Sequence, residues 1–330
     1  MNIFRGKIRI ILILGLLAGA LCWGAWERWI GGEWHHSEVT VNLSPRLSAE
    51  DFHSELLRQL PKGGERVLNH LVWRGWEHRL KPGRYTFPKN ETVMASAKRL
   101  VTGNREAVRV TIPAGRDVGP IAEATSRNIF ADSSEVATLF LQDSMMWRVL
   151  PNTYQMWWET DASTLASRMV KEHDAWWNSD RRARARAIGL SPRETTILAS
   201  IVQAETATLE EAPKVAGLYL NRLRKGMALQ ADPTLIFALG DPSIRRVLDV
   251  HKEVNSPYNT YKYAGLPPGP IRYVDPRYLQ SVLHPAEHSY LYMCAKPGGE
   301  GTHEFASTYR EHLRNARAYQ SWLNKQRIFR

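Results

Sequence analysis

The chain has 330 residues, of which 43% are hydrophobic and 23% are charged, and its 44 Lys and Arg outnumber its 33 Asp and Glu by 11. This length and balance predict about two globular domains and exclude a disordered or fibrous chain. The only cysteines are Cys22 and Cys294, which excludes a disulfide framework or a thiolate-rich metal site within one chain. The basic balance admits nucleic acid, anionic lipid and acidic polymers as partners.

The N-terminus carries the longest apolar run. Residues 10–26 are uncharged and mostly apolar, and three basic residues precede them within residues 5–9. An apolar helix of about 17 to 25 residues can cross a bilayer, and a basic flank favours a cytoplasmic N-terminus. Residues 1–30 are therefore predicted to be a cytoplasmic tip and a transmembrane signal anchor, which exports the rest of the chain. A cleaved signal peptide is the alternative, and a lipoprotein signal at Cys22 is disfavoured because a bulky leucine precedes the cysteine.

A small module follows the apolar run. Alternating residues at 39–43 predict a strand, and Ser48 is a suitable N-cap for the helix after it. Residues 81–87 resemble a turn leading into a second strand, and residues 92–102 resemble a helix closed by a glycine. This β-α-β-α order predicts an α/β or α+β module over roughly residues 38–106.

The remainder of the chain is predominantly helical in pattern. Residues 163–177 predict one helix, and residues 180–187, which contain four arginines, predict another. A solvated helix face is the simpler interpretation of the arginine run, and a surface for nucleic acid or anionic lipid is the alternative. Export of the chain argues against nucleic acid.

The most informative segment begins with a capping box. Ser191 at the N-cap, a proline after it and Glu194 three residues on predict a helix start. Leu198 and Ile201 mark the buried face of this helix, and Glu205 falls on the same stripe.

A carboxyl group on the core-facing side of a helix is desolvated, which raises its pKa towards the range of a general acid. The alternative is a structural ion pair of Glu205 with Arg222 or Arg224. Periodicity does not separate these two interpretations.

Polar loops follow this helix. Thr208 and Glu211 predict a second capping box and a second helix. Residues 229–234, 256–261 and 265–270 are loops dense in amides, hydroxyls and tyrosines, a chemistry that suits sugar hydroxyls and N-acetyl groups better than phosphates. The alternative is that the prolines and glycines of these segments only form turns and loops, without a binding role.

Several short segments in the last 130 residues occur in a specific order. They are residues 199–206, 221–223, 229–234, 258–261, 265–270, 284–286 and 290–292, with His303 and Phe305. In this order, and with residues 81–85 and the N-terminal apolar run, the chain resembles the YceG-like family of endolytic murein transglycosylases.

The resemblance implies an inner-membrane enzyme, single-pass, whose periplasmic or extracytoplasmic part cuts peptidoglycan glycan strands internally. The family glutamate that matches Glu205 is the catalytic acid and base. It protonates the oxygen of the β-1,4 bond between N-acetylmuramic acid and N-acetylglucosamine, then removes a proton from the C6 hydroxyl, which closes a 1,6-anhydro ring. One residue serves both steps because the nucleophile is internal to the substrate.

Further residues are expected around Glu205. Asp232 is the nearest second carboxylate and is interpreted as a loop-ordering or substrate-contacting residue. The expected substrate-binding residues are Gln230, Asp232, Tyr258, Asn259, Thr260, Tyr261 and His303. No metal or cofactor is expected, because the C-terminal histidines lack zinc-ligand spacing. The chain departs from the family at Gln203, where many members have glutamate, and at Asn152, where many have aspartate.

The predicted fold class is α+β. The predicted chain has a single N-terminal transmembrane helix, a small β/α module at residues 38–106, and a mixed, mainly helical domain at residues 107–330 with a loop-rich C-terminal part. The family resemblance implies that the module is LysM-like and that the helical domain is catalytic. The expected partners are peptidoglycan glycan strands, the membrane and peptidoglycan synthases, without nucleic acid. A lysozyme-like hydrolase using Glu205 and Asp232, or a non-catalytic glycan-binding scaffold, is the alternative. Anhydro or reducing ends on the products distinguish the two enzymes.

Overall fold

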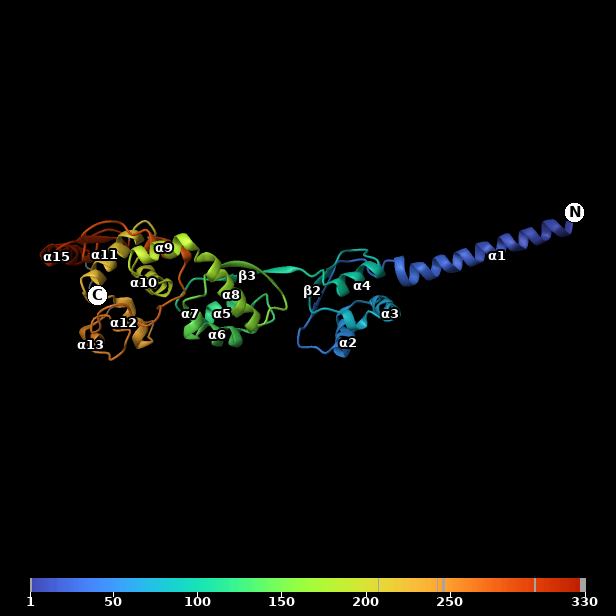
Figure 1. The fold of residues 1–330 in the computed structure, drawn as a ribbon, viewed down its shortest axis with the longest axis horizontal. Coiled ribbons are helices and arrows are strands. Elements are labelled where there is room, and N and C mark those ends of the chain that lie inside the picture. Colours follow the sequence, from blue (N-terminus) through green and yellow to red (C-terminus); the bar gives the residue numbers. More distant parts are fainter. Residues whose placement is uncertain (1, 207, 242, 245–246, 300, 327–330) are drawn as a thin grey trace. The chain divides into compact units, whose positions relative to one another are not determined.

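The computed structural model describes the chain except for residues 1, 207, 242, 245–246, 300 and 327–330, and except for the side chains of residues 2–11, 28–29 and 49–50. The fold is α+β, with mostly helices and small two-stranded sheets, as the sequence predicts (Figure 1). The chain divides into two compact units. Unit 1 comprises Met1–Val110, Asn128–Ala131 and Gln155–Asp161, and unit 2 comprises Thr111–Arg127, Asp132–Tyr154 and Ala162–Arg330.

Unit 1 begins with a long helix and continues with a small α+β core. Its elements are α1 (Asn2–Trp26), the π-helix η1 (Glu27–Gly31), β1 (Val39–Leu43), α2 (Ala49–Gln59), α3 (Glu65–Trp73), the 3-10 helix η2 (Glu77–Arg79), β2 (Gly83–Phe87) and α4 (Val93–Thr102). β1 pairs with β2 in antiparallel register, with Val41 opposite Tyr85. Both of these side chains are fully buried in the core of the unit.

The predicted strands and helices of this unit are confirmed, with one helix missed. The Ser48 hydroxyl caps α2 by accepting from the Asp51 amide, and Gly103 ends α4 in the left-handed conformation at φ 73°. The missed helix is α3, so the observed order is β-α-α-β-α. Its buried residues have helical spacing, but it has no side-chain cap, and so the signal that marks the start of α2 is absent.

The predicted transmembrane anchor is not supported by the structure. Among the residues that the structure describes, no helix combines the length and the apolarity needed to cross a membrane. The predicted single-pass location in the inner membrane therefore has no support from the described residues.

Unit 2 is mainly helical. Its elements are α5 (Val118–Ser126), α6 (Ser133–Phe140), α7 (Asp143–Met146), α8 (Ala162–Trp176), α9 (Ser179–Ala187), α10 (Pro192–Glu205), α11 (Ala212–Arg224), α12 (Asp232–Leu239), α13 (Asp249–Lys252), α14 (Pro276–Leu283), β5 (Tyr292–Ala295), β6 (His303–Ala306) and α15 (Tyr309–Lys325). β5 and β6 form an antiparallel hairpin. The unit boundaries fall inside β3 (Ala107–Ile112) and β4 (Asn152–Trp157), which pair with each other.

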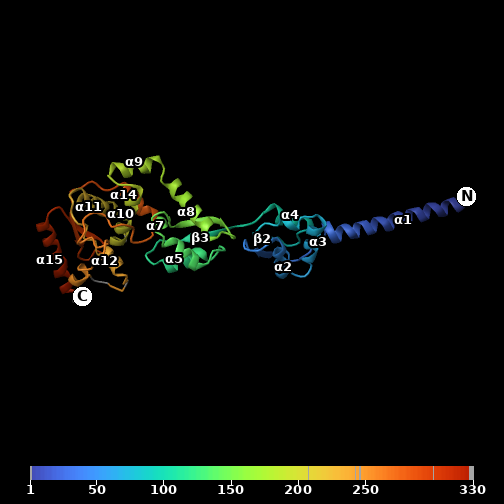
Figure 2. The same ribbon diagram turned by 60° about the horizontal axis from the view of Figure 1, so that its bottom comes forward.

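Helix α10 is the central element of unit 2 and packs against α11, α12 and α14 (Figures 1 and 2). The predicted capping box is confirmed: the Glu194 amide donates to Ser191 Oγ at 3.2 Å, and the Ser191 amide donates to Glu194 Oε2 at 2.8 Å. Leu198, Ile201 and Val202 are fully buried in the main hydrophobic cluster. Burial of each such side chain contributes roughly 1.5–3 kcal/mol, which fixes the last turn of α10.

The arginine run lies on α9 and is partly used for local structure. Arg184 pairs with Asp180 at 2.9 Å, and Arg181 and Arg182 donate to main-chain oxygens at the end of α8. Most of α9 is exposed, with Ala185 as its buried residue. These contacts favour the solvated-face interpretation.

Candidate active site

Glu205 is the last residue of α10 and lies beside Tyr219 of α11. The Tyr219 hydroxyl donates a hydrogen bond of 2.9 Å to Glu205 Oε1. Tyr219 is 2% exposed, whereas Glu205 keeps partial exposure and lines a cavity. The carboxyl group is therefore held by a buried donor and still open to a ligand.

The pKa of Glu205 is raised from 4.5 to about 7. Burial is the largest cause, and the negative charge of Asp232 raises the pKa further, while the Tyr219 hydrogen bond and the positive charge of Arg222 lower it. A group with this pKa is partly protonated near neutral pH. It can donate a proton and then accept one in a later step.

Arg222 does not neutralise Glu205 by direct contact. Its guanidinium donates to the main-chain oxygens of Leu291 and Leu229, both at 2.6 Å. In the described part of the chain, neither Arg222 nor Arg224 forms an ion pair with Glu205, whose hydrogen-bond partner is Tyr219. The structural ion-pair interpretation is therefore not supported, and Arg222 instead ties two loops together.

Asp232, Gln230 and Tyr261 are brought together by the loops around α12. Tyr261 Oη donates to Asp232 Oδ1 at 2.6 Å, and the Gln230 main-chain N–H donates to the Thr260 main-chain oxygen at 3.0 Å. Gln230 is held at a positive φ of 51°. Burial and the Asp232 hydrogen bond raise the pKa of the Tyr261 hydroxyl, so it stays a proton donor to Asp232. Asp232 itself is exposed.

The other residues expected from the 256–261 loop have structural contacts. Asn259 is fully buried and donates to the carbonyls of Lys252 and Val254, both at 2.8 Å. Thr260 is 1% exposed, and its hydroxyl accepts from the Ala231 amide at 3.0 Å. These contacts suit loop order better than direct substrate contact. Tyr258 is half-buried and its ring lies 4.8 Å from that of a phenylalanine on α12.

His303 is anchored by Glu211, which corrects one prediction. The His303 amide donates to Glu211 Oε1 at 2.8 Å, and His303 Nδ1 lies 2.7 Å from Glu211 Oε2. The predicted capping box of Thr208 with Glu211 is wrong, because α11 starts at Ala212 with no side-chain cap. The Glu211 carboxylate instead accepts from the Thr206 hydroxyl at 3.2 Å and contacts His303, 92 positions later, a contact that local spacing does not reveal.

A cavity of about 560 Å³ opens at Glu205. It is lined by Glu205, Ala295, Lys296, Gly298, Gly299, Gly301, Thr302, His303, Tyr319, Trp322 and Leu323. The cavity thus joins the end of α10 to the β5–β6 hairpin and to α15. Sequence reasoning identified Glu205 and His303 but missed Tyr219 and the α15 aromatics. The sequence marks these residues only as aromatic positions on two amphipathic helices. Core residues have the same spacing, so the pattern does not identify them as cavity residues.

The two positions at which this chain departs from the family pattern, Gln203 and Asn152, make local hydrogen bonds. Gln203 Oε1 accepts from the Asp275 amide at 3.0 Å, where α14 begins. Asn152 Oδ1 accepts from the Thr153 amide at 2.8 Å in β4. An amide performs each of these contacts as well as a carboxylate would.

In the part of the chain that the structure describes, no three His, Cys, Asp or Glu side chains lie close enough together to hold a metal ion. Cys294 is half-buried on β5, where burial raises the pKa of its thiol. A less nucleophilic thiol agrees with a packing role.

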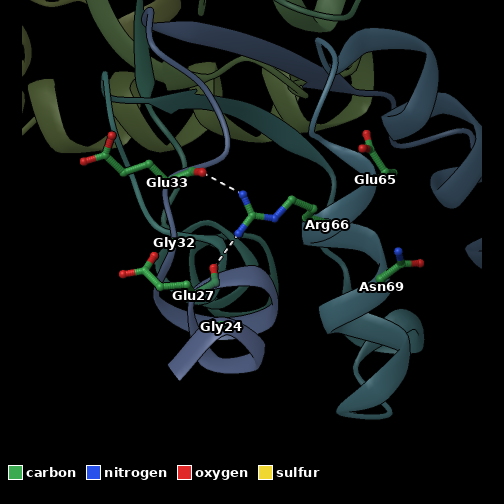
Figure 3. A pocket seen from close by; sticks show the side chains of 7 residues that line it. All are labelled: Gly24, Glu27, Gly32, Glu33, Glu65, Arg66 and Asn69. Atoms are coloured by element: carbon green, nitrogen blue, oxygen red, sulfur yellow. Dashed lines mark hydrogen bonds between the residues drawn. The ribbon is translucent and has the colours of Figure 1, made fainter. Parts of the chain in front are cut away.

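Unit 1 contains a cavity of its own, of about 620 Å³. It is lined by Gly24, Glu27, Gly32, Glu33, Glu65, Arg66 and Asn69. Figure 3 shows the Arg66 side chain reaching the main-chain oxygens of Glu33 and Glu27, at 2.7 and 2.5 Å, while both carboxylates point away from the guanidinium. Arg66 therefore ties α3 to the segment after α1, which is a structural role.

The fold and the site define an α+β protein in which a raised-pKa carboxyl group, held by a buried tyrosine, faces a polar and aromatic cavity. The model of the YceG-like family matches residues 47–318, and the chain belongs to this family.

Three relatives support the comparison. An endolytic murein transglycosylase of Bacillus subtilis is 33% identical over 167 residues, covering 51% of this chain and 45% of the relative. An endolytic murein transglycosylase of Streptococcus pneumoniae is 28% identical over 171 residues, covering 51% of this chain and 31% of the relative. A crystal structure of a YceG-like protein from Listeria monocytogenes shares the fold, with a TM-score of 0.53, 23% identity and coverage of 84% of this chain and 98% of that one. The matched part spans less than half the length of the two curated relatives.

Proposed function

We propose that this chain is an endolytic peptidoglycan lytic transglycosylase that acts on the cell wall outside the cytoplasm. The observation that carries the proposal is Glu205, with a pKa of about 7 and a Tyr219 hydrogen bond, at the edge of a 560 Å³ cavity. Family membership and the names of the relatives support the choice of peptidoglycan as substrate.

The proposed reaction uses Glu205 twice. Protonated Glu205 donates its proton to the oxygen of the β-1,4 bond between N-acetylmuramic acid and N-acetylglucosamine as that bond breaks. The resulting carboxylate then takes the proton of the C6 hydroxyl, whose oxygen closes the 1,6-anhydro ring. No water is consumed, and Glu205 ends protonated. Tyr219 keeps the carboxyl group oriented through both steps.

The test is product analysis. Purified protein should convert glycan strands into shorter strands with anhydro ends, whose mass is lower by one water than that of hydrolysis products. Glu205→Gln should slow cleavage by at least about 10²–10⁴-fold, and Glu210→Gln, an exposed neighbour, should leave it unchanged. Reducing ends would instead support the hydrolase with Asp232 as second carboxylate. Native cleavage by Glu205→Gln would refute the catalytic assignment and leave a glycan-binding scaffold.

Unit 1 is proposed to bind glycan as a LysM-like module. The proposal is supported by the antiparallel β1–β2 pair with α2 and α3 between the two strands in sequence. Hydrogen exchange of the full chain with an N-acetylglucosamine oligomer should protect residues 39–87. Unchanged exchange there would refute this role.

An enzyme that sets strand length acts where strands are made, so a peptidoglycan synthase is the proposed partner.

A further inference from the structure

Two aromatic residues of α15 face the same cavity as Glu205. Tyr319 and Trp322 are three positions apart, and their rings are stacked with centroids 6.0 Å apart and planes at 20°. Both line the cavity, and both are partly exposed. Together they form a stacked aromatic pair at the cavity, here called the aromatic platform.

Helix docking does not account for this platform. At the other end of α15, Tyr309 and His312 contact Tyr292 of β5, with ring centroids 5.8 and 5.4 Å apart. These contacts place α15 on the hairpin, whereas the platform residues remain partly open to solvent at the cavity. Large aromatic side chains gain most by burial, so partly exposed rings in a polar cavity favour a ligand-binding role.

The hairpin turn that lines the same cavity supplies polar groups without bulky side chains. The hairpin turn contains Gly298 and Gly301 at φ 66° and 78°, conformations that favour glycine. A Cβ atom at Gly298 would lie 4.0 Å from Trp322 Nε1, so the turn closely approaches the platform. Thr302 and Lys296 line the same cavity and contribute a hydroxyl and an ammonium group.

We propose that Tyr319 and Trp322 form a subsite that binds one pyranose ring of an N-acetylated glycan beside Glu205. A pyranose presents C–H bonds on its faces, which match the negative face of an aromatic ring, and hydroxyl and acetamido groups at its edge, which match Thr302 and the turn. The Lys296 ammonium suits the carboxylate of N-acetylmuramic acid. The inference rests on the proposed function for its substrate class. The matched family region ends at residue 318, before both aromatic residues.

The test measures binding at α15 in the full chain. A tetramer of N-acetylglucosamine is titrated into Glu205→Gln protein, and hydrogen exchange of peptides from residues 309–326 reports local binding, separately from any binding by unit 1. Adding Trp322→Ala or Tyr319→Ala should weaken the Kd at α15 by about tenfold. Trp322→Phe should restore most of the affinity because it keeps a ring in the platform.

Leu313→Ala is the matched control, since Leu313 is an exposed apolar residue on the same helix and does not line the cavity. It should leave the Kd at α15 unchanged. The proposal is overturned if the parent chain shows no protection at α15, if Trp322→Ala binds as tightly as the parent, or if Leu313→Ala weakens binding equally. Product analysis of the wild-type chain is independent: missing anhydro ends would refute the proposed activity, while the Kd values would still decide the subsite.

Discussion

The raised pKa of Glu205 makes a sharp prediction about stability as well as activity. Its carboxyl group has a pKa of about 7 in the folded chain against 4.5 as its ordinary value. Folding therefore favours the protonated form, and ionisation of Glu205 destabilises the folded state. Stability from this residue is fully present below about pH 4.5 and is lost as pH rises towards about 7.

Glu205→Gln should remove this loss, because glutamine does not ionise and its amide oxygen can still accept from Tyr219. Each pKa unit corresponds to about 1.4 kcal/mol, so the full shift from 4.5 to about 7 corresponds to about 3.5 kcal/mol. Solvent screening at the partly exposed Glu205 reduces this effect, so the wild-type chain should lose roughly 2–3 kcal/mol across this range. Relative to wild type, the variant should gain this amount above about pH 8.

The assay is urea unfolding of both proteins at about pH 4.5 and about pH 8.5, followed by circular dichroism. The difference in free energy of unfolding between variant and wild type should grow by about 2–3 kcal/mol between the two pH values. Glu210→Gln, which replaces an exposed carboxylate nearby, should show no such growth. A pH-independent difference for Glu205→Gln would refute the raised pKa and the general-acid argument built on it.

Three further substitutions test the surroundings of Glu205. Tyr219→Phe removes the hydrogen bond that lowers the Glu205 pKa, so the alkaline limb of the pH profile of kcat/KM should move to higher pH; an unmoved limb would exclude this coupling. Asp232→Asn removes a charge that raises the same pKa, so the alkaline limb should move to lower pH. The cleavage rate should stay within about tenfold of the wild-type rate. A loss of about 10²-fold or more would favour the hydrolase. Glu211→Gln weakens the contact with His303 and should lower the free energy of unfolding by about 1–3 kcal/mol in urea titrations; unchanged stability would show that this contact is not needed.

Local sequence signals predicted the helix that positions the catalytic candidate. The capping box of Ser191 with Glu194 depends on residues three positions apart, and the apolar stripe that includes Leu198 depends on helical periodicity. Both are short-range, so the start of α10 and the core-facing side of Glu205 were predicted correctly. The same reasoning missed α3, which has the apolar stripe but lacks a side-chain cap.

Composition was a weaker guide at the N-terminus. The run at residues 10–26 has the apolar character of an anchor. Among the described residues, however, no helix has both the length and the apolarity that a membrane span requires. The anchor prediction, which came from counting apolar residues near the lower limit of a span, is therefore not supported.

By itself, the sequence determined that this is an α+β chain with a carboxyl group on a buried helix face, and it carried the resemblance to the YceG-like family. Tertiary structure decided which groups meet that carboxyl group. Tyr219 reaches Glu205 from another helix, Glu211 holds His303 across 92 positions, and α15 brings Trp322 to the same cavity. Periodicity shows which face of an element is buried, but the partners of that face depend on packing between elements distant in sequence.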